Sequence, residues 1–414
     1  MPDRSLASPT TRAPRYIVVF HAPGERSVSL MSRILGVGEA RHVRARSGTT
    51  VLRARSPDVP PPRVYERLGV AVTDLDDDQV RRLRAEEHVA AVVANERCFT
   101  PASTAVRPAA EVSSAPGHSW CLEMMGVTAG HRFTGRGVTV AVLDTGVDLD
   151  HPELGTRFKE DSNAASFVPT ERVQDGHGHG THCVGVAGGP VRSRSGTRYG
   201  VAPGVRLLVG KVLSDAGSGF TDWILDGIDW AVENHARIIA LSCVSSRAAG
   251  QPHAVAYERV AASLLQARPG VLLVAAAGNA SARPWYTRAV DNPAACPSLM
   301  AVAAVHPARR IASFSGRQMD EIGEINLAAP GVGVHSAWTG GGFRTRSGTS
   351  MAVPHVAGVA ALYLEERPNL SARDLWRALQ ARAQPLGDPC DFGRGLVQAG
   401  AGAERTLDSG TTVR

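Results

Sequence analysis

Three segments of the sequence carry side chains that can do nucleophilic or acid–base chemistry. They are LDTGVD (143–148), DGHGHGTHCVG (175–185) and SGTSMAVPHVAGVAALYL (347–364). Each segment also has a plain structural interpretation. Asp144 can cap a turn, Ser350 can cap a helix, and the histidines can bind a metal, although the HExxH and HxxEH spacings of zinc proteases are absent.

The chain order of these segments favours catalysis over the structural alternatives. A serine hydroxyl is a weak nucleophile and needs a base such as His179 to take its proton, while Asp144 can orient and stabilise that imidazole. The order Asp, His, Ser is one of the known orders of such a triad. Ser350 precedes a strongly helical run, and Pro354 suits a first helical turn. The amides of a helix N-terminus favour a developing oxyanion.

The elements that would position these side chains alternate between strands and helices. Continuous apolar runs typical of strands buried on both faces are VTVAVLD (138–144), RLLVGKVL (206–213), ARIIALS (236–242) and VLLVAAAG (271–278). Helical spacing of apolar residues occurs at 221–234 and 254–267. The pattern predicts an α/β fold with a doubly wound parallel sheet flanked by helices and the site at the carboxyl ends of its strands.

Together, the motifs resemble those of the subtilisin-like serine proteases of the peptidase S8 family, and most nearly the proteinase K-like branch. The resemblance rests on DTGVDLDHPEL (144–154), DGHGHGTHCVG (175–185), AAGN (276–279) and GTSMAVPHVAG (348–358). It covers about residues 119–402 and implies a serine endopeptidase that cleaves polypeptides through an acyl-enzyme, with Asp144, His179 and Ser350 as its triad.

The resemblance also implies the remaining parts of the active site. Asn279 would donate its side-chain amide to the oxyanion. Substrate would pair with two segments, made of Ser242, Cys243 and Val244, and of Ala276, Ala277 and Gly278. The family usually has Ser-Leu-Gly-Gly where this chain has Ser-Cys-Val-Ser at 242–245, so we expect Val244 to disfavour large aromatic side chains at P1, the residue before the scissile bond.

Structural Ca²⁺ is the one cofactor that the resemblance suggests, and we expect no organic cofactor. The nominated ligands are Pro297, Leu299 and Asn326, with Glu153 at the place of another family ligand. Asn326 stands where proteinase K relatives have Asp. The loss of a formal charge weakens an oxygen-ligand site without abolishing it, so the sequence leaves calcium open.

The N-terminal third has its own pattern. Strands are expected at 15–22 and 89–94 and a helix at 78–86, enough for a small α+β unit over residues 15–99. This unit resembles the inhibitor I9-type propeptide of the family, which implies an intramolecular inhibitor, although an ordinary accessory domain is the alternative. Residues 100–118, rich in Pro, Ala and Ser, predict a linker with a processing site between about Cys98 and Ser119.

The remaining boundaries and partners follow from composition. We expect a disordered N-terminus at 1–14, a catalytic domain at 119–405, a tail at 406–414 and a monomer. The net charge is +6, but arginines are spread along the chain, which argues against nucleic acid as a partner. No run approaches a membrane span, and the first residues lack the apolar core of a secretory signal. The compartment stays open, since the sequence suggests the cytoplasm and the family suggests secretion.

Two other functions compete with general proteolysis. A pseudoprotease would bind peptides without cutting them, but the complete set Asp144, His179, Asn279 and Ser350 argues against it. A dedicated processing or regulatory protease with one protein substrate is the stronger alternative, because the 242–245 segment departs from the family pattern. Six cysteines without a CxxC pair suggest neither a zinc ribbon nor a redox site, and leave disulfides open.

Overall fold

The computed structural model describes residues 14–37, 49–54, 60–101, 117–128 and 131–400. Its contacts divide the chain into two compact units, one ending at Asn95 and the other beginning at Glu96. Apart from Pro14, the tails predicted at 1–14 and 406–414 lie outside the described residues. Residues 102–116 of the predicted linker lie outside them as well.

The first unit is a five-stranded antiparallel sheet with the strand order β2-β3-β4-β1-β5 and two helices. Its elements are β1 (Arg15–Phe20), α1 (Arg26–Leu35), β2 (Thr49–Val51), β3 (Arg63–Tyr65), β4 (Val70–Asp74), α2 (Asp77–Arg84) and β5 (Val89–Ala94). Asp76 and Gln79 form a reciprocal capping box that fixes the start of α2. The expected strand–helix–strand elements are present, and α1, β2, β3 and β4 add to them.

The second unit is built on a seven-stranded parallel sheet in the order β14-β13-β12-β11-β7-β9-β8. Its strands are β7 (Thr139–Asp144), β8 (Ala164–Ser166), β9 (Arg206–Lys211), β11 (Ile238–Leu241), β12 (Leu272–Ala276), β13 (Met300–Val305) and β14 (Leu327–Pro330). Every residue of β7, β11, β12, β13 and β14 is buried, which explains their continuous apolar sequences.

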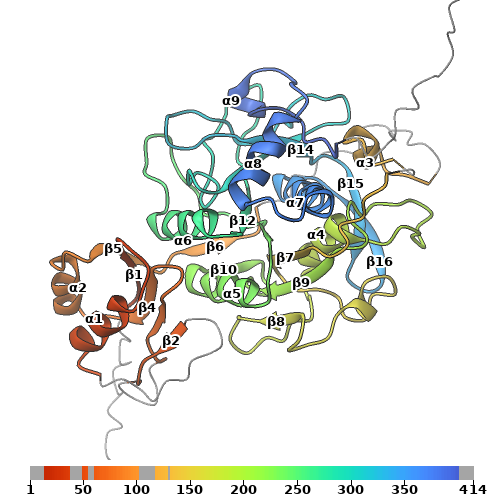
Figure 1. The fold of residues 1–414 in the computed structure, drawn as a ribbon. Helices are drawn as coiled ribbons and strands as arrows, with labels where there is room; N and C mark the ends of the chain where they lie inside the picture. The colour runs from red at the N-terminus through yellow and green to blue at the C-terminus, as the bar shows by residue number, and fades with distance from the viewer. Residues whose placement is uncertain (1–13, 38–48, 55–59, 102–116, 129–130, 401–414) are drawn as a thin grey trace, which may run out of the picture. The chain divides into compact units, whose positions relative to one another are not determined.

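Helices cover both faces of this sheet. On one side α4 (His179–Gly188) and α7 (Thr349–Glu366) pack against each other, and on the other lie α5 (Thr221–Glu233) and α6 (Val255–Gln266) (Figure 1). The central helix α7, buried from Thr349 to Leu364, contacts five strands, from β7 to β14. The predicted doubly wound α/β fold is therefore confirmed.

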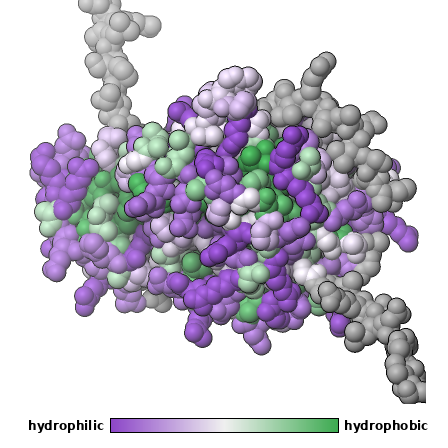
Figure 2. Space-filling view, turned by 90° about the horizontal axis from the view of Figure 1, so that it is seen from above, coloured by the Kyte–Doolittle hydropathy of each residue, from purple (hydrophilic) through white to green (hydrophobic). Residues whose placement is uncertain are grey.

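Smaller elements complete the second unit. They are β6 (Arg97–Phe99), α3 (Trp120–Met124), η1 (Gly155–Arg157), β10 (Ser218–Phe220), β15 (Val334–Trp338), β16 (Gly342–Arg346), α8 (Ala372–Ala381) and α9 (Pro389–Phe392). Strands β15 and β16 form an antiparallel ribbon whose second strand leads directly into α7. None of the helices in the described part of the chain is long and apolar enough to cross a membrane. The face in Figure 2 carries hydrophilic side chains over most of its area, as expected of a solvated surface.

Candidate active site

The carboxyl end of β7 brings Asp144 to His179. Asp144 is the last residue of β7 and is completely buried, and His179 is the first residue of α4. The His179 Nδ1 atom lies 2.7 Å from Asp144 Oδ1, which also accepts a hydrogen bond from the Thr145 amide. A carboxylate in this position fixes the tautomer that leaves the other ring nitrogen, Nε2, able to accept a proton.

The turn before His179 is held by a second buried carboxylate, that of Asp175. Its Oδ1 accepts hydrogen bonds from the amides of His177 and Gly178, and its Oδ2 accepts two from Thr181 in the first turn of α4. Asp175 also accepts the hydroxyl of Thr145, the residue that follows Asp144. One side chain therefore ties the His179 turn to the end of β7.

Close backbone approach explains one glycine of the GHGHG run. A Cβ atom on Gly180 would come within 2.3 Å of the Gly146 carbonyl oxygen, so a side chain there would push α4 away from the loop after β7. The Gly180 amide instead donates to the Thr145 hydroxyl at 2.8 Å.

Ser350 occupies the second position of α7, after Gly348 as the N-cap. The sequence predicted Pro354 in the first turn of this helix, but the structure places it in the helix interior. Proline has no N–H to give to the carbonyl four residues earlier, which is that of Ser350. Instead, that carbonyl oxygen accepts hydrogen bonds from the Ser242 hydroxyl at 3.1 Å and from the Cys183 thiol at 3.6 Å. The missing helical hydrogen bond is thus replaced by two contacts with side chains of other segments.

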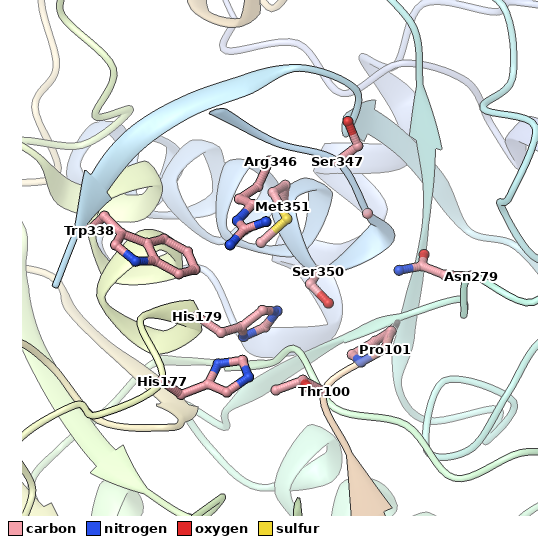
Figure 3. A pocket seen from close by; sticks show the side chains of 11 residues that line it. Thr100, Pro101, His177, His179, Asn279, Trp338, Arg346, Ser347, Ser350 and Met351 are labelled. Atoms are coloured by element: carbon pink, nitrogen blue, oxygen red, sulfur yellow. The ribbon is translucent and has the colours of Figure 1, made fainter. Parts of the chain in front are cut away.

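The Ser350 hydroxyl donates to the Ser242 carbonyl oxygen at 3.3 Å. No hydrogen bond between described residues joins it to His179, although both side chains point into the same pocket (Figure 3). Catalytic hydrogen bonds of this kind often tighten only when substrate is bound.

Asn279 is anchored by its carbonyl oxygen. Its Oδ1 accepts both the amide and the hydroxyl of Thr349, at 2.9 Å and 2.8 Å, so its NH₂ group is turned toward the pocket (Figure 3). No hydrogen bond within the described part of the chain uses the neighbouring Ser350 N–H, which is one of the open donors of the helix start. Two donors can therefore converge on an oxyanion beside Ser350.

These groups share one pocket of about 200 Å³. It is lined by Thr100, Pro101, His177, His179, Asn279, Trp338, Arg346, Ser347, Gly348, Ser350 and Met351 (Figure 3). Of the residues that the sequence nominated, the structure brings His179, Asn279 and Ser350 to the pocket and places Asp144 behind His179.

The two nominated substrate-binding segments flank this pocket in different ways. Val244 exchanges both backbone hydrogen bonds with Phe99, each at 2.9 Å, whereas the side chain of Cys243 is buried. Ala276, Ala277 and Gly278 are buried as well, and the Gly278 amide donates to the Thr349 hydroxyl. In this structure, the second segment supports α7 and Asn279 and does not line the pocket.

A stretch of the chain itself, Glu96–Pro101, lies in the cleft as an added strand. On one side β6 pairs antiparallel with β10, and Thr100 donates its amide to the Gly217 carbonyl at 2.8 Å. On the other side Phe99 pairs with Val244. Backbone hydrogen bonds on both edges are the mode by which extended peptides bind to a sheet.

Two side chains of this added strand, those of Cys98 and Pro101, are buried, whereas Glu96, Arg97 and Phe99 are exposed. Cys98 is fully buried, with its Sγ atom 3.4 Å from the Tyr257 hydroxyl, and Pro101 is buried at the pocket. Burial raises the pKa of the Cys98 thiol to about 11, so the group remains a neutral thiol.

The histidines of the Gly-rich run differ in protonation. Burial opposes protonation of His179, but the adjacent Asp144 carboxylate outweighs it and raises the His179 pKa well above its ordinary value. Burial lowers the pKa of His182 to about 3, and its Nε2 lies within hydrogen-bond distance of the Val334 and Arg344 carbonyls. His182 thus has a structural role, whereas His177 lines the pocket and its pKa is lowered, first by burial.

The two side chains nominated for calcium, Glu153 and Asn326, accept hydrogen bonds from protein donors. Glu153 accepts hydrogen bonds from the hydroxyls of Ser193 and Tyr199 and from the Arg194 amide. Asn326 Oδ1 accepts the Ala301 amide at 2.7 Å. To bind a cation, these oxygens would have to share the lone pairs that accept these hydrogen bonds, and Pro297 and Leu299 would contribute backbone carbonyls.

Two further observations concern possible ligands. Among the described residues, the one cluster of His, Cys, Asp or Glu close enough to share a metal ion is Asp144, His179 and Cys183, which is the site already described. All six cysteines are free, and burial raises the pKa of Cys183.

The pocket lining includes residues that were not nominated from the sequence, among them Thr100, Pro101, Trp338, Arg346, Ser347 and Met351. Met351 and Ser347 could have been found, since they neighbour Ser350 in the chain. Trp338 and Arg346 carry no local signal, because the ribbon pairing of β15 with β16 brings them there.

Comparisons with known proteins agree with this geometry. The profile described as "Subtilase family" matches residues 135–398. Subtilisin E of Bacillus subtilis (strain 168) is 33% identical over 342 residues, 82% of each chain. Subtilisin of Bacillus pumilus is 38% identical over 274 residues, 66% of this chain and 93% of that protein.

A solved structure described as a cold adapted subtilisin-like serine proteinase has the same fold. It is 33% identical, with a TM-score of 0.56, and the match covers 68% of this chain and 97% of the other. The family profile spans more than half of the chain and the relatives cover most of it. The chain therefore belongs to the subtilase family and is a serine-type peptidase.

Proposed function

We propose that the protein is a serine endopeptidase made as a self-inhibited zymogen, with Asp144, His179 and Ser350 as its triad. The 2.7 Å contact between His179 and Asp144, beside Ser350 and Asn279 in one pocket, supports catalysis. The added strand Glu96–Pro101 in that cleft is the observation that carries the zymogen proposal.

The residues act in the following order. His179 Nε2 takes the proton of the Ser350 hydroxyl as its oxygen attacks the scissile carbonyl carbon. Asn279 and the Ser350 N–H donate to the oxyanion of the tetrahedral intermediate. His179 returns its proton to the leaving amine, the C–N bond breaks, and water hydrolyses the acyl-enzyme by the same sequence. Asp144 stays ionised and stabilises the imidazolium.

The N-terminal unit acts as the inhibitor because its C-terminal extension, Glu96–Pro101, fills the cleft. Thr100 and Pro101 line the pocket beside Ser350, so the bond that follows Pro101 in the sequence, Pro101–Ala102, is the maturation site. This site lies within the range that the linker composition predicts.

A fluorophosphonate probe combined with N-terminal sequencing tests this proposal. The wild-type chain should label at Ser350 and yield a product that begins at Ala102, whereas Ser350→Ala should neither label nor process. Failure to label even after cleavage of the linker by an added protease would overturn the enzyme assignment. A mature start near Ser119 would instead overturn only the maturation site.

We further propose that P1 is small. Val244 stands where relatives have Gly, its side chain is packed in the core, and the residue that reaches the pocket is Pro101. Cleavage of a peptide library should give small residues at P1, and a strong preference for Phe or Leu would contradict the idea. Such narrow selectivity also favours the alternative of a dedicated processing protease, which a comparison of casein with native lysate as substrates would distinguish from broad proteolysis.

A further inference from the structure

The ribbon that leads into α7 carries an unusual group of cations beside the nucleophile. In its register Trp338 lies opposite Gly342, and alternation along β16 puts residues 342, 344 and 346 on one face of the ribbon. The guanidinium carbons of Arg344 and Arg346 lie 4.8 Å and 4.4 Å from the centre of the Trp338 ring. Two arginines therefore share one indole, and only three residues separate Arg346 from Ser350 in the chain.

The indole that holds these arginines is itself held against the catalytic turn. Trp338 is 8% exposed, and a Cβ atom on Gly178 would come within 2.4 Å of its ring. Gly178, at φ 96°, directly precedes His179, so Trp338 packs on the turn that carries the general base. Cation–π stacking on a fixed ring gives Arg346 a defined place in the pocket lining.

Among the residues that the structure describes, the two guanidinium groups have no anionic partner. None of the ion pairs formed within the described ranges includes Arg344 or Arg346. Partial burial and the charge of Arg344 lower the pKa of Arg346, but a guanidinium stays charged in proteins. A partly desolvated cation without a carboxylate, lining a binding pocket, is complementary to an anionic ligand group.

The position of Trp338 and Arg346 relative to the strand Glu96–Pro101 shows which side of the scissile bond they would contact. Arg346 and Trp338 lie across Ser350 and His179 from Pro101 and Asn279 (Figure 3). A polypeptide that enters the cleft in the direction of Glu96–Pro101 passes Ser350 at its scissile bond and continues toward Arg346. The cluster thus faces the leaving-group side, whose residues are called P1′ and P2′.

We propose that Arg346, supported by Trp338 and Arg344, determines specificity for an acidic side chain at P1′ or P2′. This inference rests on the proposed peptidase function. The chain's own linker has no acidic residue between Ala102 and Ala110. Its own maturation sequence leaves the cluster unused, and the preferred external substrates differ from it in having Asp or Glu after the scissile bond.

Matched internally quenched peptides test this proposal on the full chain after it has matured. All peptides carry Phe-Thr-Pro before the scissile bond, and Glu, Gln or Lys at P1′ or P2′. We expect kcat/KM to be about tenfold higher for Glu than for Gln at one of these positions, since a charge-assisted contact of this kind is enough for about one decade. The ratio should shrink as salt is added, because screening weakens the attraction.

The variants assign the preference to one residue. Arg346→Gln should bring the Glu/Gln ratio close to one and Arg346→Lys should keep part of it, because lysine retains the charge but loses the planar fork. Arg373→Gln, on the exposed side of α8, is the matched control and should leave the ratio unchanged. Equal rates for Glu and Gln in the wild type, or a ratio that survives Arg346→Gln, would overturn the inference.

A binding experiment separates this inference from the proposed catalysis. Dye-labelled Glu and Gln peptides are titrated against full-length Ser350→Ala with and without Arg346→Gln. Both peptides compete with the same internal strand, so the ratio of their apparent Kd values reports the subsite. A Glu preference that requires Arg346 supports the inference even if no peptide is hydrolysed, and the absence of any preference contradicts it.

Discussion

His179 is subject to opposing influences that together set the pH dependence of the site. Burial disfavours the imidazolium, whereas the Asp144 carboxylate at 2.7 Å favours it and outweighs burial. Catalysis needs the neutral imidazole as the base and is therefore favoured by high pH, whereas the stability contributed by this pair is favoured by low pH. Because the folded-state pKa is raised, the protonated pair contributes stability that is fully present below the unfolded pKa of about 6.5 and is lost as the pH rises through the folded value.

The first prediction concerns this titration. For the matured enzyme, kcat/KM should increase with pH along an acid limb whose midpoint lies above 6.5, the ordinary value for histidine. Asp144→Asn should move the limb to lower pH and reduce kcat by about 10⁴-fold, because the wrong tautomer is favoured. The pH–rate profiles of the two proteins measure this, and a limb that does not move in Asp144→Asn would contradict the electrostatic argument.

A second prediction concerns Asn279, whose Oδ1 is committed to Thr349 and whose NH₂ faces the pocket. Asn279→Ala should lower kcat about 100–1,000-fold, as found on loss of an oxyanion donor in subtilisin, and change KM little because the donor acts mainly in the transition state. Steady-state kinetics with one good peptide measure both constants. If KM rises while kcat is kept, Asn279 binds the ground state and has no oxyanion role.

Among the secondary-structure elements, the turn at 175–180 matters most, because it fixes α4 relative to β7. Asp175 accepts hydrogen bonds from His177, Gly178 and Thr181 at the start of α4, and from Thr145 after β7. The sequence showed the Gly-rich run but gave no sign that Asp175 is its anchor, since it is the tertiary contact with Thr145 that creates this role.

We therefore predict that Asp175→Asn, although isosteric, lowers both the free energy of unfolding and kcat/KM. An amide NH₂ would replace one acceptor oxygen among buried donors, at a cost of about 1–3 kcal/mol in the free energy of unfolding. The same change should lower kcat/KM, because His179 would lose its fixed orientation. Denaturant unfolding and kinetics measure the two effects, and Asp150→Asn, at an exposed position of the loop after β7, is the control. A stable but inactive variant would place the role of Asp175 in orientation alone.

The elements that the sequence predicted well are those with continuous apolar runs. The strand ending at Asp144, the helix at 221–233 and the helix after Gly348 all lie within about two residues of the expected bounds. Buried segments such as these have continuous or periodic apolar residues, and this pattern can be seen in the sequence alone. The ribbon of β15 and β16 was missed because its strands are short and partly exposed. The place of Pro354 was misjudged because only the tertiary contacts of the Ser350 carbonyl show how the missing hydrogen bond is replaced.

For the whole chain, the sequence predicted the triad, Asn279 and an N-terminal α+β unit, but not which residues lie in the cleft. The predicted boundary at residue 99 follows sequence composition, whereas contacts divide the chain after Asn95. Residues 96–101 group with the second unit because their backbone bonds are made to β10 and Val244. Backbone pairing leaves little trace in side-chain pattern, so this assignment needed the structure.

In the proposed zymogen, the two-sided backbone pairing of Glu96–Pro101 would make inhibition depend on concentration. While the chain is intact, the strand is tethered to its own cleft, and short flexible tethers give effective concentrations of about millimolar. The proposed cleavage after Pro101 would remove the tether, so the released N-terminal fragment would then compete by ordinary bimolecular binding. We predict that the specific activity of freshly processed enzyme rises on dilution and falls when purified fragment 1–101 is added back.

Activity assays at a series of enzyme concentrations measure this effect, with a preparation freed of the fragment as the control. A specific activity that is independent of dilution in both preparations would mean that the fragment leaves the cleft on cleavage without rebinding. If the prediction holds, cleavage alone does not activate the enzyme. Newly processed molecules at high local concentration stay inhibited by the released fragment, and they become active when enzyme and fragment diffuse apart.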